Sequence, residues 1–116
     1  MQNRFILTFF LLIAVFFSCE REEALRTHTF DVTFAGVGID CKLALIEFQE
    51  EDLSKIKSIT GYDWLTYHAY NLDKEKYQIG EIITVVVRQT YDQELFFCTT
   101  LGPGFPWVTV IKDSQK

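Results

Sequence analysis

The sequence predicts an all-β or β-rich α+β domain, a small antiparallel barrel of five or six strands with one short helix. Short runs with alternating apolar and polar residues recur from residue 30 to residue 112. Glycine, proline or short polar breaks separate these runs, and a single segment shows apolar residues at a spacing of three. Closure into a barrel would remove exposed edges, which suits strands as apolar as residues 82–87.

The first two strands are predicted at residues 30–37 and 41–48. In the first run Phe30, Val32 and Phe34 fall on one face, with polar residues between them. A turn with two glycines follows, and the second run alternates in the same way. The pair therefore predicts a hairpin.

The predicted helix spans residues 49–60. Leu53, Ile56 and Ile59 recur every three residues, with acidic residues before them and lysines near the end. Acids early and bases late complement the helix dipole. Gly61 is placed to end the helix.

The second half of the chain is predicted to supply the remaining strands. Its β-branched and aromatic residues fit a pleated surface. The expected order is a strand at 62–70, a polar connection at 71–78, the strongest strand at 81–91, a turn at Asp92-Gln93, a strand at 94–100, a Gly/Pro loop at 101–106 and a last strand at 107–112. This layout resembles an oligonucleotide/oligosaccharide-binding (OB) type of barrel.

The N-terminus has the layout of an export signal. Arg4 precedes 13 residues, Phe5 to Phe17, that are apolar apart from one threonine, and Ser18 and Cys19 follow. A membrane-spanning helix needs about 20 apolar residues, whereas the apolar part of a cleavable signal has roughly 7–15. The segment resembles a bacterial lipoprotein signal in which Cys19 takes the lipid. An uncleaved anchor and plain secretion are the alternatives.

These features divide the chain into four parts: a lipoprotein signal peptide at 1–18, a lipid-anchored polar tether at 19–29, the barrel domain at 30–113 and a C-terminal tail at 114–116. Residues 20–23 (EREE) resemble the acidic flank of lipoproteins sent to the outer face of the outer membrane, or are simply a soluble linker. We expect a cell-envelope outer membrane lipoprotein, periplasmic or surface-exposed. The membrane is then a partner through the lipid.

The charge balance argues against nucleic acid as a partner. The chain carries 11 basic and 16 acidic residues, a net charge of −5 at pH 7. An acidic surface repels phosphate backbones.

Three cysteines are an odd number for an exported protein. If Cys19 carries the lipid, Cys41 and Cys98 are left to form a disulfide in an oxidising compartment. That bridge would contribute about 4 kcal/mol in the chain-entropy model. Free buried thiols, a metal pair and a catalytic thiol are the alternatives.

A further set of residues resembles a family. Tyr70-Asn71-Leu72, then Tyr77, Gly80 and the valine-rich strand, then Cys98-Thr99-Thr100, are similar to features of small exported lipoproteins of Gram-negative bacteria. That resemblance implies a disulfide-braced OB-like barrel, with Cys41 matching the early cysteine and Cys98 the later one. It implies an envelope address but no catalytic residue.

Candidate catalytic and metal groups are sparse. Cys98 as a nucleophile with His68 as its base is conceivable, and so is zinc held by these two and Cys41. The CxxC and HxxxH spacings are absent, and no cluster of cations lies near either cysteine in sequence. Paired carboxylates such as Asp63 and Asp92 have no specificity in so acidic a chain. We predict no catalytic residues, no metal and no cofactor.

The aromatic residues of the second half are the candidate binding surface: Trp64, Tyr67, Tyr70, Phe105 and Trp107, with Tyr62 beside them. Aromatic faces at a barrel mouth can stack on sugar rings or hold a peptide. In the alternative, which we favour, Trp64 and Trp107 fill the two ends of the barrel. Whether the Phe105-Pro106 bond is cis stays open.

We therefore expect a non-enzymatic binding or accessory module for a protein, a peptide or a glycan. One alternative is an inhibitor of an envelope protease that presents the loop Leu101–Trp107. A thiol or metal enzyme using Cys98 and His68 is the less favoured alternative.

Overall fold

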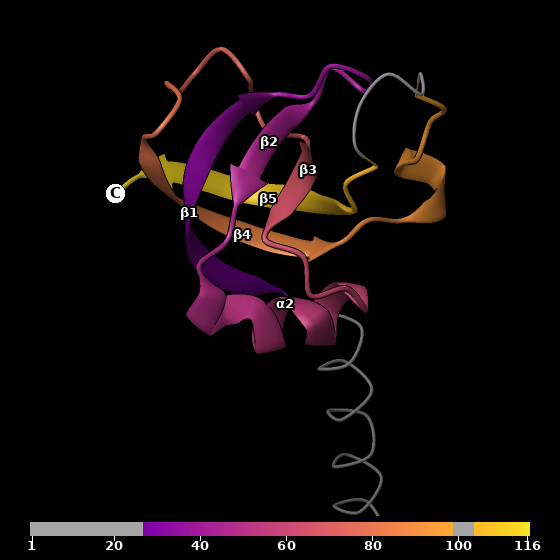
Figure 1. Ribbon diagram of the computed structural model, residues 1–116, viewed down its shortest axis with the longest axis horizontal. Helices are drawn as coiled ribbons and strands as arrows, with labels where there is room; N and C mark the ends of the chain where they lie inside the picture. Colours follow the sequence, from indigo (N-terminus) through magenta and orange to yellow (C-terminus); the bar gives the residue numbers. More distant parts are fainter. Residues whose placement is uncertain (1–26, 99–103) are drawn as a thin grey trace, which may run out of the picture.

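The computed structural model describes residues 27–98 and 104–116 (Figure 1). Over these residues the chain forms five strands, one α-helix and two 3-10 helices. In order they are β1 (His28–Val37), β2 (Ala44–Glu47), η1 (Glu50–Asp52), α2 (Leu53–Thr60), β3 (Thr66–Tyr70), β4 (Ile82–Gln89), η2 (Asp92–Glu94) and β5 (Trp107–Gln115). The predicted signal peptide and most of the predicted tether lie outside the described residues.

The strands close into a barrel in the order β1-β2-β3-β5-β4, with β4 pairing back onto β1 (Figure 1). The predicted small β-rich barrel with one short helix is confirmed. The sheet is mixed, however, because β3 and β5 run parallel, with His68 opposite Trp107 and Tyr70 opposite Thr109. The prediction of a purely antiparallel barrel is therefore wrong at this pair, since alternation along a strand does not encode its direction.

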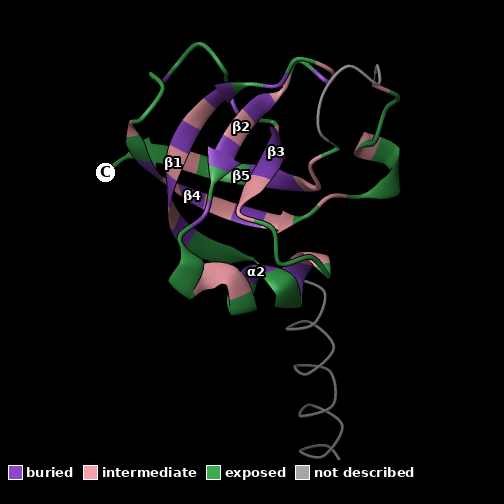
Figure 2. Ribbon diagram, in the orientation of Figure 1, coloured by how far each residue is buried: buried purple, intermediate pink, exposed green. Residues whose placement is uncertain are grey.

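Alternation along the strands builds the core (Figure 2). On β1 the side chains of Phe30, Val32 and Phe34 are buried, as predicted, and their neighbours are only partly covered. β4 repeats the alternation with Ile83, Val85 and Val87, whereas β5 buries three residues in succession, Val108, Thr109 and Val110.

Helix α2 lies across one end of the barrel (Figure 1). Ile56 and Ile59 are buried, as their spacing predicts, and Leu53 packs against the core from the first turn. Gly61 ends the helix in the left-handed conformation (φ +83°), and its N–H donates to the carbonyl of Lys57. The predicted helix is confirmed, with its first turn in 3-10 geometry.

Two predicted strands are corrected. The second strand is only Ala44–Glu47, and Cys41 lies in the turn before it. Residues 94–98 form the end of η2 and an irregular segment, whereas a strand was predicted there. Two phenylalanines and a leucine there are about half exposed or more, because this segment lies outside the barrel wall. In contrast, β5 runs to Gln115, through most of the predicted tail.

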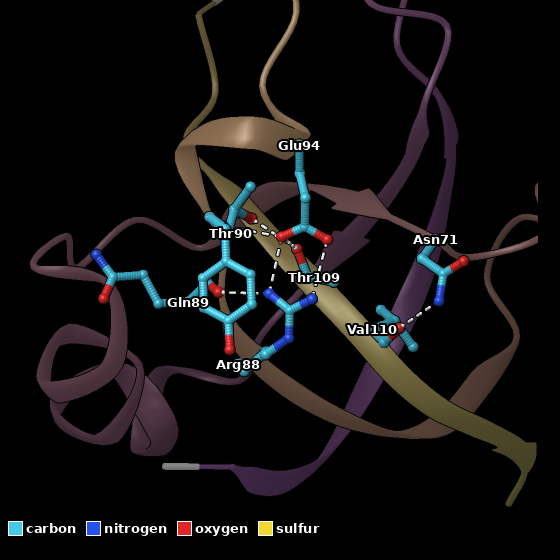
Figure 3. A network of polar contacts seen from close by, with 8 residues as sticks. Asn71, Arg88, Gln89, Thr90, Glu94, Thr109 and Val110 are labelled. Carbon is cyan, nitrogen blue, oxygen red and sulfur yellow. Dashed lines mark hydrogen bonds and ion pairs between the residues drawn. The ribbon is translucent and has the colours of Figure 1, made fainter. Parts of the chain in front are cut away.

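Asn71, from the family-like motif, links β3 to β5. It has a left-handed backbone (φ +69°), which asparagine tolerates better than most residues. Its side-chain amide donates a hydrogen bond of 3.0 Å to the carbonyl of Val110 (Figure 3). The next residue, Leu72, is buried in the core.

Candidate functional site

An open cavity of about 370 Å³ lies beside the meeting point of β3 and β5. Three segments line it: the connection from α2 to β3, the end of β4 with the start of the β4–β5 connection, and the residues that lead into β5. We call it the aromatic cavity and define it by these residues: Thr60, Tyr62, Trp64, Gln89, Thr90, Asp92, Leu95, Gly104, Phe105, Pro106 and Trp107.

Four aromatic residues contribute to its wall: Tyr62, Trp64, Phe105 and Trp107. The ring of Trp64 stands at 90° to that of Phe105, with centroids 6.3 Å apart. Trp107 packs edge-on against Phe96 at 4.9 Å and stacks with Tyr70 at 6.2 Å. Edge-to-face and offset pairs of this kind hold aromatic side chains in fixed orientations. These ring contacts hold Trp64, Phe105 and Trp107 in the wall of the cavity.

The predicted binding residues do not all reach the cavity. Trp64, Phe105 and Trp107 line it, whereas Tyr70 lies behind Trp107 and is not part of the lining. Tyr67 was wrongly predicted as binding surface: it is fully buried, and its hydroxyl donates a 2.7 Å hydrogen bond to the carbonyl of Tyr62. It points inward because β3 presents that face to the core.

Trp64 does not plug the barrel, contrary to the alternative favoured from the sequence. Its side chain is 46% exposed, and Tyr62 beside it is 56% exposed. Helix α2 covers the barrel end instead, with Ile56 and Ile59. The peptide bond between Phe105 and Pro106 is trans.

The rim of the cavity is braced by a polar network (Figure 3). Two nitrogens of Arg88 donate to the two carboxylate oxygens of Glu94, at 2.8 and 2.9 Å. The backbone N–H of Tyr91 and the hydroxyl of Thr109 also donate to Glu94, at 2.8 and 3.1 Å. The Arg88 guanidinium lowers the pKa of Glu94 to about 2, so the carboxylate stays ionised. The ring of Tyr91 covers the guanidinium at 3.9 Å.

A second brace joins two loops. The sulfurs of Cys41 and Cys98 lie 2.03 Å apart, the distance of a disulfide. The pair ties the turn between β1 and β2 to the β4–β5 connection, which carries Asp92 and Leu95 of the cavity. The rim is thus held at both Glu94 and Cys98.

His68 lies behind the aromatic wall. It is 1% exposed, its ring lies 5.7 Å from that of Phe105, and its Nδ1 has no hydrogen-bond partner among the described residues. Burial lowers its pKa, while Asp40, with an oxygen 3.8 Å from Nε2, acts in the opposite direction. Gly38 leaves the space that this ring fills.

Asp40, Cys41 and His68 are the nearest approach to the predicted zinc alternative. One donor atom from each lies within 4.8 Å of the others. With the Cys41 sulfur shared with Cys98, the group offers a carboxylate and an imidazole, whereas structural zinc takes about four ligands. Thiol chemistry at Cys98 would likewise require prior reduction.

The other candidate groups are scattered. His28 is exposed at the start of β1. Asp92 lines the aromatic cavity and Asp63 does not. Of the predicted inhibitor loop, residues 101–103 lie outside the described residues, and Gly104–Trp107 form one wall of the cavity.

Sequence reasoning missed the polar part of the lining. Thr60, Gln89 and Thr90 supply this part, and the apolar Leu95 was missed as well. The antiparallel pairing of β4 with β5 sets Gln89 opposite Val108, and the parallel pairing of β3 with β5 places the connection from α2 nearby. Nothing in their local pattern marks them. Asp92 was named only as one of many possible acids.

Within the described residues, no helix is long and apolar enough to cross a membrane. No protein-family model, no curated protein and no solved structure matches this chain.

Proposed function

We propose that this protein is a lipid-anchored cell-envelope lipoprotein that acts as a non-enzymatic binding module, with the aromatic cavity as its ligand site. The observation that carries the binding role is that aromatic rings lining the aromatic cavity are exposed to solvent. Trp64 and Tyr62 leave about half of their surface to solvent although each packs beside the barrel. A small domain has little buried apolar surface, so leaving large aromatic side chains exposed lowers its stability. A ligand that covers these side chains would bury that surface.

The sequence supports the envelope address. The apolar run before Cys19 has the length of a cleavable signal. The sulfurs of Cys41 and Cys98 lie at disulfide distance, and such bonds persist in oxidising compartments outside the cytoplasm. Acylation at Cys19 would leave these two cysteines as the remaining pair.

The geometry weighs against the thiol-enzyme alternative. A nucleophilic cysteine needs a free thiolate in a partly exposed, electropositive setting. The Cys98 sulfur is instead at bonding distance from Cys41, and His68 is sealed in the core. The aromatic cavity is better suited to binding a ligand than to catalysing a reaction on it.

The anchor is tested by intact mass spectrometry of protein purified from its native host. We expect a chain that begins at Cys19 and carries fatty-acyl groups, and a Cys19→Ala variant that is neither acylated nor processed there. A wild-type chain that retains residues 1–18, or lacks an acyl group, would overturn the anchor.

The binding site is tested separately through its two tryptophans, which are the only ones in the chain and both line the cavity. Tryptophan emission of the full-length protein is titrated with peptide and glycan fractions of the host envelope. We expect a saturable change with one class and its loss in Trp64→Ala. No change with any fraction would overturn the binding role of this cavity.

A further inference from the structure

We infer that the aromatic cavity takes a short neutral glycan. This inference rests on the proposed function and names the class of ligand for the same site. A pyranose ring has one face of C–H bonds and an edge of hydroxyl groups. It therefore needs an aromatic surface and free polar groups side by side.

The aromatic surface is present on two walls. Trp64 and Phe105 meet at 90°, so a ring lying on one of them has its edge against the other. Trp107 and Tyr62 also line the cavity. The cavity, at about 370 Å³, falls in the usual range for small-molecule sites, about 300–1,000 Å³. It therefore suits a short saccharide.

Free polar groups are present at the rim. The side-chain amide of Gln89 and the carboxylate of Asp92 line the cavity, and neither makes a side-chain hydrogen bond to another described residue. Their neighbours Arg88, Glu94 and Thr90 are already engaged in the polar network. An amide can donate and accept, and a carboxylate accepts from hydroxyls, so these two match the edge of a sugar.

Charge selects a neutral ligand over an acidic one. No lysine or arginine is among the described residues that line the cavity. Arg88, the only arginine among the described residues, is held by Glu94 and covered by Tyr91. The chain as a whole is acidic, with a net charge of −5. A phosphorylated, sulfated or uronic ligand would meet Asp92 without a compensating cation.

The barrel also disfavours an extended peptide. Peptides commonly bind by adding a strand to an exposed sheet edge. Here β4 pairs with both β1 and β5, and β3 pairs with both β2 and β5, so the five described strands close on themselves. Side-chain recognition alone remains for a peptide, whereas a saccharide needs no strand edge.

The experiment uses the full-length protein in a detergent without a sugar headgroup. Neutral trisaccharides of glucose, galactose, mannose and N-acetylglucosamine are titrated by tryptophan emission and by calorimetry. Matched probes are an acidic trigalacturonate, choline and a neutral tripeptide. We expect saturable binding of at least one neutral trisaccharide and none of the matched probes.

Three variants localise the binding. Trp64→Ala is expected to weaken it by about tenfold or more, and Asp92→Asn by a smaller factor. Phe97→Ala, at a fully exposed aromatic residue outside the cavity lining, should leave it unchanged. If Trp64→Ala loses its folded circular dichroism spectrum, Tyr62→Ala takes its place.

The outcomes separate the two proposals. Binding of the acidic saccharide, choline or the peptide in preference to the neutral panel would overturn the glycan assignment and leave the binding module standing. Neutral binding that survives Trp64→Ala would also overturn it. If no neutral trisaccharide binds but envelope peptides do, only the glycan assignment is rejected. If no probe and no envelope fraction binds, both the glycan assignment and the binding role of the aromatic cavity are rejected.

Discussion

Arg88 and Glu94 meet fork to fork across the start of the β4–β5 connection, with two parallel hydrogen bonds of 2.8 and 2.9 Å. Both side chains are mostly covered, at 21% and 15% exposure. Bidentate pairs in such a setting fix geometry as well as adding energy. The pair holds the segment that carries Asp92 and Leu95 into the aromatic cavity.

Replacing Glu94 with Gln should lower the free energy of unfolding at pH 7 by about 2 kcal/mol, because Arg88 would be left without its charged partner. The pKa of Glu94 is about 2 in the fold against an ordinary 4.5. Its stabilisation is therefore complete above about pH 4.5 and is lost as the pH falls towards 2.

Urea denaturation of wild type and Glu94→Gln at several pH values measures this difference. The gap between them should narrow from pH 5 to pH 2. Glu51→Gln, at an exposed residue of η1, is the control and should change little. A gap that is constant over this range would contradict the assignment.

Gly38→Ala should destabilise the fold by about 1–3 kcal/mol. A Cβ at this position would lie 2.8 Å from Cε1 and 3.2 Å from Nδ1 of His68, a buried ring that has little room to move. Thermal unfolding checks the effect. Gly104→Ala is the matched control, since a Cβ there meets nothing within 4 Å. Equal melting temperatures for the two variants would show that the turn shifts freely.

Removing the pair Cys41 and Cys98 by double substitution with alanine should cost about 4 kcal/mol, because the bridge closes a loop across a separation of 57 residues. Denaturation with and without a dithiol reductant measures it. On reduction, the free energy of unfolding of the wild type should fall to that of the double variant. The free energy of unfolding of the double variant should not change with the reductant. If the reductant does not change the stability of the wild type, the disulfide between Cys41 and Cys98 is contradicted.

Stability should fall as the pH drops below about 6.5, because His68 is buried as the neutral imidazole. Burial lowers its pKa from 6.5, with Asp40 opposing. The unfolded state therefore takes up the proton first, at up to about 1.4 kcal/mol per pH unit.

Between pH 7.5 and 5.5, His68→Phe should remove most of this slope, whatever its effect on stability at pH 7.5. His28→Gln should retain the slope, since His28 is exposed and is the only other histidine. Identical slopes for wild type and His68→Phe would refute the buried neutral state.

Much of the fold could be predicted because it depends on local patterns. The alternation of Phe30, Val32 and Phe34 and the spacing of Ile56 and Ile59 each identify a buried face without knowledge of the partner. The segment 94–98 was mistaken for a strand because its apolar residues look like core. They are exposed beside the cavity instead.

The candidate site was only partly predictable. Trp64, Phe105 and Trp107 stood out as aromatic residues near turns, but their meeting depends on the parallel pairing of β3 with β5. Tyr67 has the same local signature and is buried. Gln89 became a candidate only once strand β4 was seen to end at the cavity.

The pairing of β1 with β4 limits how far the aromatic cavity can lie from the membrane. His28 lies opposite Val87, two residues before Gln89, so the chain enters the barrel at the end where the cavity opens. If Cys19 is acylated, as we propose, the nine steps from it to His28 span roughly 30 Å when extended. Ligands captured there would then be those found within a few nanometres of the bilayer.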